Sequence, residues 1–600
     1  MRRPRHLIAA PAVLLALLLG GCATDATTGS SGETSADTAT TVTDVSAGAT
    51  AAEVLAANAD VHAVEEVPAT SGTIVLDGGT ITTDGDGMTV AGSTVTIGAG
   101  GTYTLSGTLD DGQVVVDAGD AVVHLVLDGV DITSSTTAAV AVLSAGSVEV
   151  ELADGSSNAL TDAATYADAE DEANAALFSA ADLTITGDGA LTVTGRANDG
   201  IASKDGLVVA SGTITVDAVD DGIRGKDYLV VSGGTVEVTA GGDGLKADDA
   251  DDTTAGFVAV EAGDVTVTAG GDGVDAETDV VLTGGTLDVT AGGGSATSPT
   301  DETSTKGVKG NASVVVGGGT LTVDASDDAV HSNGVVSVTD GDLTLSSGDD
   351  GVHADVALDV TGGSVTVLDS YEGLEAEAIT LAGGDISVVA SDDGVNAASS
   401  ATGSTEDASG DWAGPGGETS GTATLTITGG TLTVDAGGDG LDANGTLTMS
   451  GGTVVVNGPT DDGNGALDVD GSLTVTGGSL VAAGSSGMAV APGTDGQGWV
   501  SATFESAQAA GTTLTVLDAD GTVVATFTPT KAITSLVVSD AAITAGETYA
   551  VLSGSSEVLT VTAGEHTAGT GGMGAAGGPG GGVPDGGARP GGQDRGAAQG

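Results

Sequence analysis

Acidic residues recur along this chain at a fixed spacing, each followed by a glycine and an aliphatic residue. Asp199-Gly200-Ile201, Asp221-Gly222-Ile223 and Asp243-Gly244-Leu245 lie 22 residues apart. The phrase returns through Asp439 and ends in a degenerate copy, Asn464-Gly465-Ala466. In a repeat protein, carboxylates spaced in this way stack in neighbouring coils, about 4.8 Å from one another. Because like charges repel at that distance, the stack predicts a compensating cation.

The ligand chemistry favours Ca²⁺, which prefers carboxylate oxygens. We expect the ligands in two columns of the repeat, the residue before the glycine and the residue four positions after it. The candidate metal ligands are Asp221, Asp243, Asp248, Asp272, Glu277, Asp328, Asp350, Asp355, Glu372, Glu377, Asp393 and Asp439. An alternative is that these side chains point into water at turns, where Asp-Gly is common. His331 and His353 also stack one coil apart, and we interpret them as solvated residues because no cysteine joins them.

Most of the few basic residues gather on the same coils. If the coil register holds, they form one basic face beside the acidic column, and this face suits a polymer that carries carboxylates, such as a uronate-containing polysaccharide. The candidate carbohydrate-binding residues are Arg196, Lys204, Arg224, Lys226, Lys246 and Lys309. The alternative is that these side chains neutralise neighbouring aspartates through local ion pairs. No catalytic motif stands out, and we assign no catalytic residue.

Composition excludes several classes of function. The chain has 600 residues, 103 of them glycine, and a formal net charge of −72. Such a charge argues against nucleic acid as a partner, because neutralising phosphates requires clustered Lys and Arg. A single cysteine excludes a disulfide scaffold. Aromatic residues make up only 2%, which argues against an aromatic platform for stacking sugars.

The repeat predicts the fold class. Short alternating strands, Gly-Gly turns and a period near 22 residues are typical of one solenoid coil per repeat. We therefore expect an all-β protein, a right-handed parallel β-helix whose coils span residues 171–496. Residues 69–170 read as an N-terminal β region that begins the helix. We expect a small C-terminal β cap at 497–562 and a disordered Gly/Pro-rich tail at 563–600.

The N-terminus resembles a bacterial lipoprotein signal. Residues 1–21 contain a basic start and an apolar run that ends at Gly20-Gly21, directly before Cys22. The resemblance implies cleavage before Cys22 and lipidation of its thiol. Residues 22–68 read as a Thr/Ala/Ser-rich linker. These features predict a protein anchored by lipid to the extracellular face of the cell membrane.

Several phrases resemble a family of secreted bacterial carbohydrate-binding β-helix proteins, over residues 70–560. The phrases are Gly107-Thr108-Leu109, Asp111-Gly112-Gln113, Asp131-Ile132-Thr133-Ser134-Ser135, Leu177-Phe178-Ser179, Asn198-Asp199-Gly200-Ile201-Ala202-Ser203-Lys204-Asp205 and Asp220-Asp221-Gly222-Ile223-Arg224-Gly225-Lys226. The resemblance implies a right-handed parallel β-helix, bound calcium, and binding to cellulose and polygalacturonate. It supports calcium at Asp221, Asp243 and Asp272. The family's fold is similar to that of calcium-dependent pectate lyases, which cleave by β-elimination.

Together these observations predict a calcium-dependent, lipid-anchored surface protein that binds an acidic or cellulosic polysaccharide without cleaving it. One alternative is a calcium-dependent polysaccharide lyase in which Lys204, Lys226 or Lys246 abstracts a proton. Another is a purely structural surface protein whose acidic faces keep it soluble.

Overall fold

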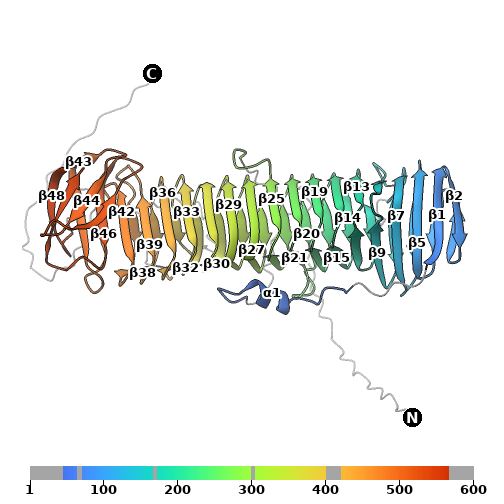
Figure 1. Cartoon of the computed structure of the whole chain (residues 1–600), viewed down its shortest axis with the longest axis horizontal. Coiled ribbons are helices and arrows are strands. Elements are labelled where there is room, and N and C mark those ends of the chain that lie inside the picture. The colour runs from blue at the N-terminus through green and yellow to red at the C-terminus, as the bar shows by residue number, and fades with distance from the viewer. Residues whose placement is uncertain (1–44, 64–69, 167–171, 299–303, 400–420, 567–600) are drawn as a thin grey trace, which may run out of the picture. The chain divides into compact units, whose positions relative to one another are not determined.

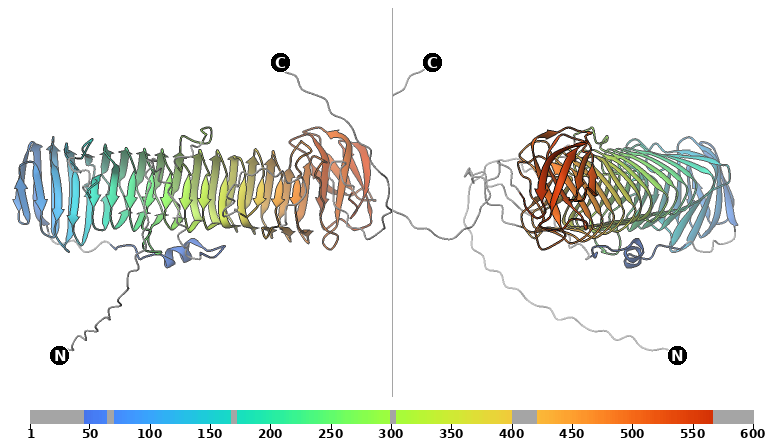
Figure 2. Two further views of the ribbon diagram at one scale, coloured as in Figure 1. Left: turned by 180° about the vertical axis from the view of Figure 1, so that it is seen from behind. Right: turned by 60° about the vertical axis from the view of Figure 1, so that its left-hand side comes forward.

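The computed structural model describes residues 45–63, 70–166, 172–298, 304–399 and 421–566. Within them the chain is almost entirely β-structure with one short helix, and most strands pair in parallel. Figures 1 and 2 show these strands following one another in sequence order along the long axis of the view. No helix among the described residues has the length and apolar character needed to cross a membrane. The predicted signal segment 1–21, the lipidation site Cys22 and residues 567–600 of the tail lie outside the described residues.

Each coil contributes strands to three parallel stacks. The ladder stack carries the Asp-Gly-aliphatic phrases, and its strands pair each with the next through parallel registers. It consists of β4 (Thr94–Ile97), β6 (Gln113–Asp117), β8 (Val140–Ser144), β11 (Ala175–Ser179), β14 (Asp199–Ser203), β17 (Ile223–Gly225), β20 (Leu245–Ala247), β23 (Val274–Ala276), β26 (Val308–Gly310), β28 (Val330–Ser332), β30 (Val352–Val360), β32 (Leu374–Leu381), β34 (Val395–Ala397), β37 (Leu441–Ala443) and β40 (Leu467–Val469).

The second stack follows the ladder stack in each coil. It consists of β5 (Gly101–Leu109), β7 (Val122–Thr133), β9 (Ser147–Leu152), β12 (Leu183–Gly187), β15 (Gly206–Val209), β18 (Tyr228–Val231), β21 (Phe257–Val260), β24 (Asp279–Leu282), β27 (Ser313–Ala325), β29 (Val335–Ser347), the C-terminal halves of β30 and β32, β35 (Thr424–Ile427), β38 (Thr446–Met449) and β41 (Leu473–Val475).

The third stack closes each coil and leads to the next ladder strand. It consists of β1 (Thr70–Gly78), the ends of β5 and β7, β10 (Ser157–Thr161), β13 (Ala190–Gly195), β16 (Thr213–Ala218), β19 (Thr235–Ala240), β22 (Asp264–Ala269), β25 (Thr286–Ala291), the ends of β27 and β29, β31 (Ser364–Asp369), β33 (Asp385–Ala390), β36 (Thr431–Ala436), β39 (Thr453–Asn457) and β42 (Ser479–Gly484).

The register agrees with the phrase alignment at all but the last coil. The aliphatic residues pair directly, Ile201 with Ile223, Ile223 with Leu245, and onward to Leu441. In the last coil, however, Leu441 pairs with Leu467 rather than with Ala466. The predicted alignment of Asn464-Gly465-Ala466 is therefore wrong by one residue. The buried leucine sets the register, because a slip of one residue would turn it outward.

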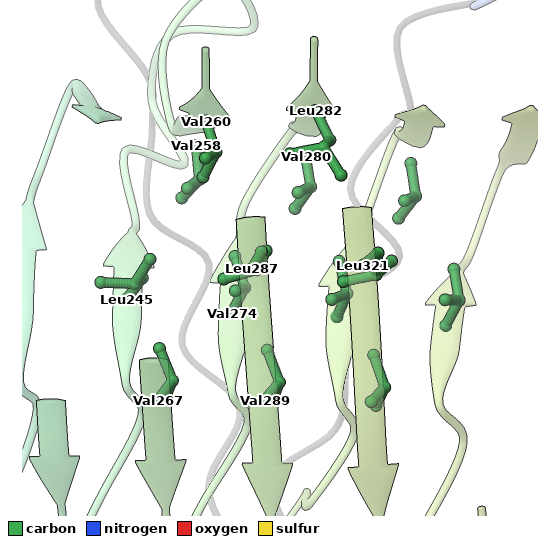
Figure 3. Packing of buried hydrophobic residues seen from close by; sticks show 14 of the residues in the cluster. Leu245, Val258, Val260, Val267, Val274, Val280, Leu282, Leu287, Val289 and Leu321 are labelled. Carbon is green, nitrogen blue, oxygen red and sulfur yellow. The ribbon is translucent and has the colours of Figure 1, made fainter. Parts of the chain in front are cut away.

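The core consists of stacked aliphatic columns. In Figure 3, Leu245 and Val274 form one column of the ladder stack, and Leu287 and Leu321 form one of the third stack. Val258 and Val280 belong to a column of the second stack, which Figure 3 also shows. All of these side chains are buried. Each contributes about 1.5–3 kcal/mol by leaving water, so the columns stabilise the coils without aromatic residues.

The glycine of each phrase is required by close packing. A Cβ on Gly222 would lie 2.2 Å from Cγ1 of Val238 and 2.6 Å from the carbonyl oxygen of Gly244. The same valine contact recurs for neighbouring glycines, as between Gly200 and Val216. A larger residue in the ladder strand therefore requires a different side chain in the third stack.

Two coils show this compensation. Ala329 and Ala466 occupy the position of the glycine. In the first of these coils the third stack has Leu345 in register with Val323, and in the second it has Ala482 in register with Val456. Leucine and alanine both remove the γ-methyl group that a Cβ would meet.

We therefore expect Gly222→Ala to lower the free energy of unfolding by about 2 kcal/mol, because it overpacks the coil. In a Val238→Ala background the same substitution should cost less, because the contact with the γ-methyl group is gone and only the close approach to the carbonyl oxygen of Gly244 remains. Urea denaturation measures both differences, with Gly79→Ala as control, since a Cβ at Gly79 meets nothing within 4 Å. An equal cost in the two backgrounds would contradict the packing argument.

Antiparallel strands lie at both ends of the stacks. At the start, β2 (Thr80–Gly85) pairs antiparallel with β1, and β3 (Met88–Ala91) with β4. At the other end, β46 (Ile533–Ser539) lies antiparallel between β42 and β43 (Trp499–Gln508). A separate antiparallel sheet of β44 (Leu514–Leu517), β45 (Val523–Phe527), β47 (Thr548–Ser553) and β48 (Ser556–Thr562) follows, as Figure 1 shows. Antiparallel strands of this kind cover exposed strand edges.

A short helix lies against the second stack. Helix α1 (Ala51–Ala57) begins with a capping box, in which Thr50 and Glu53 bond reciprocally. Its buried residue Val54 packs against Val281 and Val315 of β24 and β27. Part of the stretch expected as a linker, residues 22–68, is therefore folded against the stacks.

Candidate functional site

The predicted acidic column exists, and backbone hydrogen bonds hold it. Oδ1 of Asp221 accepts a bond from the amide of Asp243 at 2.9 Å, and Oδ1 of Asp243 accepts one from the amide of Asp272 at 2.8 Å. The pattern recurs at Asp328 and Asp393. We call the residues that precede the phrase glycine the acid ladder: Asp199, Asp221, Asp243, Asp272, Asp328, Asp350, Glu372, Asp393 and Asp439. Each of these bonded carboxylates receives one neutral donor from the following coil.

Burial argues against the alternative that the side chains point into water for the most enclosed residues of the ladder. Asp199 is 1% exposed, Asp272 2% and Asp328 3%. Burying a carboxylate is unfavourable unless it is hydrogen-bonded and its charge is compensated. The ladder therefore needs positive charge within contact distance.

Basic residues two positions after the phrase glycine supply this charge in the N-terminal part of the ladder. Nζ of Lys246 contacts carboxylate oxygens of both Asp221 and Asp243. Nζ of Lys309 lies 3.6 Å from Oδ2 of Asp272. These contacts favour local ion pairing over a free basic face.

The other predicted carbohydrate-binding residues divide into two groups. Arg224 contacts Asp199 and Asp248, and Lys226 lies 3.0 Å from Asp249. Arg196 and Lys204, by contrast, are exposed, and within the described part of the chain neither side chain forms an ion pair. As far as the described residues show their contacts, only these two of the six candidates leave a positive charge available to a ligand.

Histidines continue the column of cations. His331 pairs in register with Lys309 and with His353, and the two imidazole rings lie 5.0 Å apart between centroids. Nδ1 of His331 lies 2.8 Å from Oδ2 of Asp328, and Nδ1 of His353 lies 2.9 Å from Oδ2 of Asp350. The interpretation of both histidines as solvated residues is therefore wrong. A signal for it is present in the sequence, since Asp-Ala-Val-His and Asp-Gly-Val-His have the i,i+3 spacing of the Asp243–Lys246 pair.

One lysine occupies a ladder position itself. Lys306 stands where the other coils have an acid, and its Nζ lies 2.7 Å from Oδ2 of Asp328 and 3.1 Å from Oδ1 of Asp327. Lys306 thus neutralises the next carboxylate of the acid ladder.

The outer column of predicted ligands is also occupied by protein contacts. Asp248 binds Arg224, and Oδ1 of Asp355 lies 3.3 Å from Nε2 of His353. Oε1 of Glu377 accepts a bond from the hydroxyl of Thr422 at 2.8 Å. Glu277 lies near Asp275, whose charge adds to burial in raising the pKa of Glu277.

The C-terminal end of the ladder lacks this compensation. After His353 the register continues through Glu375, Asn396 and Asp442, none of which is basic. In the described part of the chain, no Lys, Arg or His forms an ion pair with Asp393, Asp439 or Asp442. We call these three residues the C-terminal acid cluster.

Their ionisation reflects the missing cation. Burial, together with the charges of Asp393 and Asp439, raises the pKa of Asp442 to about 8. Burial raises the pKa of Asp439 to about 7, with a further contribution from Asp393. Burial is also the main cause that raises the pKa of Asp393 to about 6. The cluster is therefore only partly ionised at neutral pH unless a cation binds.

A buried amide lies in the same region. Asn396 is 8% exposed and pairs in register with Asp442. Its Nδ2 donates to Oε2 of Glu372 at 2.8 Å, and its buried Oδ1 has no hydrogen-bond partner in the described part of the chain. A buried oxygen that accepts no hydrogen bond is unfavourable inside a protein. A bound ion is one explanation for such an atom.

One exposed aromatic ring also borders the ladder. Tyr371 immediately precedes Glu372, is 48% exposed, and hydrogen-bonds through its side chain to Asp392. Its backbone bonds to the neighbouring coils at Asp349 and Asp392. Composition alone argues against an aromatic sugar contact, but it cannot show that one of the few rings faces solvent.

Comparisons with known proteins find similarity over part of this chain. A family model described as "Carbohydrate-binding domain-containing protein" matches residues 91–351. A protein of that description from Acetivibrio thermocellus is 48% identical over 124 residues, which are 20% of this chain and 43% of the relative. The match thus spans less than half of that relative's length.

A solved structure gives a weaker likeness. The polysaccharide lyase-like protein from C. thermocellum is 31% identical and covers 48% of this chain and 97% of its own, with a TM-score of 0.35. At that score the superposition supports no conclusion about fold or activity. The similarity that counts is in sequence, and over residues 91–351 this chain is similar to carbohydrate-binding domain-containing proteins.

Proposed function

We propose that this protein binds an acidic polysaccharide through the outer edge of its ladder stack and does so with the help of calcium. The observation that carries the proposal is the match to a carbohydrate-binding family over residues 91–351, because the two unpaired basic side chains fall within it. The three parallel stacks fit a parallel β-helix with coils of about 22 residues, which we infer to be right-handed from the general preference of parallel crossovers.

The sugar contact is assigned to the two free cations. Arg196 directly follows β13 and Lys204 directly follows β14, so they lie on either side of the first complete phrase. A guanidinium and an ammonium group both bind carboxylates, and the guanidinium can do so through two parallel bonds. Further along the same edge, the exposed ring of Tyr371 offers an apolar face to a sugar. A polymer lying along the stack could contact both regions.

Calcium is assigned to the C-terminal acid cluster and Asn396. Carboxylate and amide oxygens are suitable Ca²⁺ ligands, and among the described residues the buried Oδ1 of Asn396 has no hydrogen-bond partner. Of the other predicted ligands, Asp221, Asp243, Asp272 and Asp328 already contact Lys246, Lys309 or Lys306. Calcium would there compete with a bound ammonium group. The cluster is therefore the better candidate.

The contacts of two of the three candidate lysines, Lys226 and Lys246, support binding without cleavage. A proton-abstracting lysine must be neutral, which requires a lowered pKa. The hydrogen bond to Asp249 raises the pKa of Lys226. Although burial opposes it, contact with Asp243 and Asp221 raises the pKa of Lys246 above its ordinary value. Both groups remain protonated, and neither suits a lyase mechanism.

The proposed cellular location rests on the segment before Cys22 that resembles a bacterial lipoprotein signal. We propose that lipidation of Cys22 anchors the protein to the extracellular face of the membrane, where calcium and polysaccharides are available. The folded coils would then be held at the cell surface by an acyl chain rather than by a membrane-spanning segment.

We expect retention on calcium polygalacturonate gel to weaken at least about ten-fold in Arg196→Ala/Lys204→Ala, because charge-assisted hydrogen bonds are lost. Lys531→Ala is the matched control, since Lys531 is paired with Asp435 outside the matched region. A pull-down with insoluble polygalacturonate and cellulose measures both. Equal retention of the double variant would overturn the assignment, and sustained formation of unsaturated product would favour the lyase alternative.

A further inference from the structure

One rung of the ladder combines imidazole and carboxylate in a single contact. Asp350 precedes β30, His353 lies on β30, and Glu375 pairs in register with His353 from β32. Nδ1 of His353 lies 2.9 Å from Oδ2 of Asp350 and 3.3 Å from Oε2 of Glu375. We propose that these three residues form a binding site for a divalent transition-metal ion of the zinc class.

The distances suit such an ion. Ligands about 2.1 Å from a tetrahedral zinc ion lie about 3.4 Å from one another. The ligand atoms of the three residues already lie within 4.8 Å of one another, and the two contacts to Nδ1 need to open by only a few tenths of an ångström. All three come from two adjacent coils, and the parallel pairing of β30 with β32 fixes the spacing of His353 and Glu375.

The outer nitrogen of the imidazole is also held as metal sites require. Nε2 of His353 lies 3.3 Å from Oδ1 of Asp355. A carboxylate that accepts the remaining N–H orients the ring and fixes which nitrogen binds the metal. Because Asp355 serves this purpose, it is a positioning residue rather than a ligand.

Charge provides the driving force. Nδ1 of His353 contacts the carboxylates of both Asp350 and Glu375, so two acidic groups face one imidazole. A divalent ion bound at this place neutralises both carboxylates. Because an imidazole nitrogen must be free of its proton to bind a metal ion, affinity should increase with pH.

The imidazole distinguishes this site from the calcium cluster. Imidazole nitrogen favours zinc, nickel or copper, whereas calcium prefers oxygen ligands only. The neighbouring group of Asp328, His331 and His353 is less suitable, because Nζ of Lys306 already lies 2.7 Å from the carboxylate of Asp328. The side chains of His353 and Glu375 are 19% and 20% exposed, so an ion can reach the site.

The test is calorimetric titration of the full chain with zinc chloride, in millimolar calcium and without a polyhistidine tag. We expect zinc to bind in the presence of calcium, and more tightly at pH 8 than at pH 6. His353→Gln and Glu375→Gln should each weaken binding at least about ten-fold. His124→Gln is the matched control. Among the described residues, His124 forms an ion pair with one carboxylate, that of Glu151, and belongs to no cluster of three metal-ligating side chains.

Circular dichroism shows whether each variant folds, and Glu375→Gln decides the question if His353→Gln does not. The proposal is overturned if wild type binds no zinc, if calcium displaces it, or if both ligand variants bind zinc as wild type does. None of these outcomes depends on whether the chain binds a polysaccharide.

Discussion

Lys246→Met is expected to lower the free energy of unfolding by about 3 kcal/mol at neutral pH, because it leaves two buried carboxylates without their cation. Nζ of Lys246 contacts Asp221 and Asp243, whose side chains are 10% and 15% exposed. Methionine keeps most of the packing volume, so the loss reports on charge rather than on a cavity. Thermal and urea denaturation measure the difference.

Low pH should reduce the cost of this substitution. In the variant, Asp221, whose pKa burial already raises, can become neutral by taking up a proton, whereas wild type gains less from protonation. Lys204→Met is the control, since Lys204 is exposed and forms no ion pair within the described residues. If Lys246→Met and Lys204→Met have equal stability at neutral pH, the ladder does not depend on its internal cations.

The second large effect is a fall in stability with rising pH when divalent cations are removed. The folded-state pKa values of Asp393, Asp439 and Asp442, about 6, 7 and 8, lie above the ordinary aspartate value. Between about pH 4 and pH 8 the folded chain therefore binds more protons than the unfolded chain, so stability decreases as pH rises through this window. We expect the melting temperature in chelator to fall by several degrees from pH 5 to pH 8.

Other ladder acids titrate in the same range, so the comparison must be made between variants. Asp439→Asn/Asp442→Asn removes two of the three charges while keeping side-chain size. The pH dependence of its melting temperature should be flatter than that of wild type. If the melting temperatures of the two proteins depend on pH with the same slope, the C-terminal acid cluster does not cause the loss of stability at high pH.

Much of the fold could be predicted from the repeat because its requirements are local. Inward aliphatic residues must alternate, and the glycine after each ladder acid must leave room for a valine such as Val238. The last coil could not be placed from its Asn464-Gly465 phrase, because Leu467 and the third-stack residue Ala482 determine the register there. Helix α1 was missed, although the capping residues Thr50 and Glu53 stand in the sequence.

The ladder was predicted as a set of columns, but its charge balance was not. The column positions show that Asp221 and Asp243 stack. They do not show that Nζ of Lys246 contacts both carboxylates. The spacing Asp-x-x-Lys or Asp-x-x-His within one coil would have indicated those pairs. Recognising the absence of such a pair after residue 353 would have separated the C-terminal acid cluster from the rest of the ladder.

Protein cations neutralise the N-terminal part of the ladder, and we propose that calcium neutralises its C-terminal end. Calorimetric titration of the chelator-treated chain with calcium tests this claim most directly. We predict that wild type binds calcium, that Lys204→Met binds it equally well, and that Asp439→Asn/Asp442→Asn loses most of the binding. Undiminished calcium binding by the double variant, or no binding by wild type, would contradict the account.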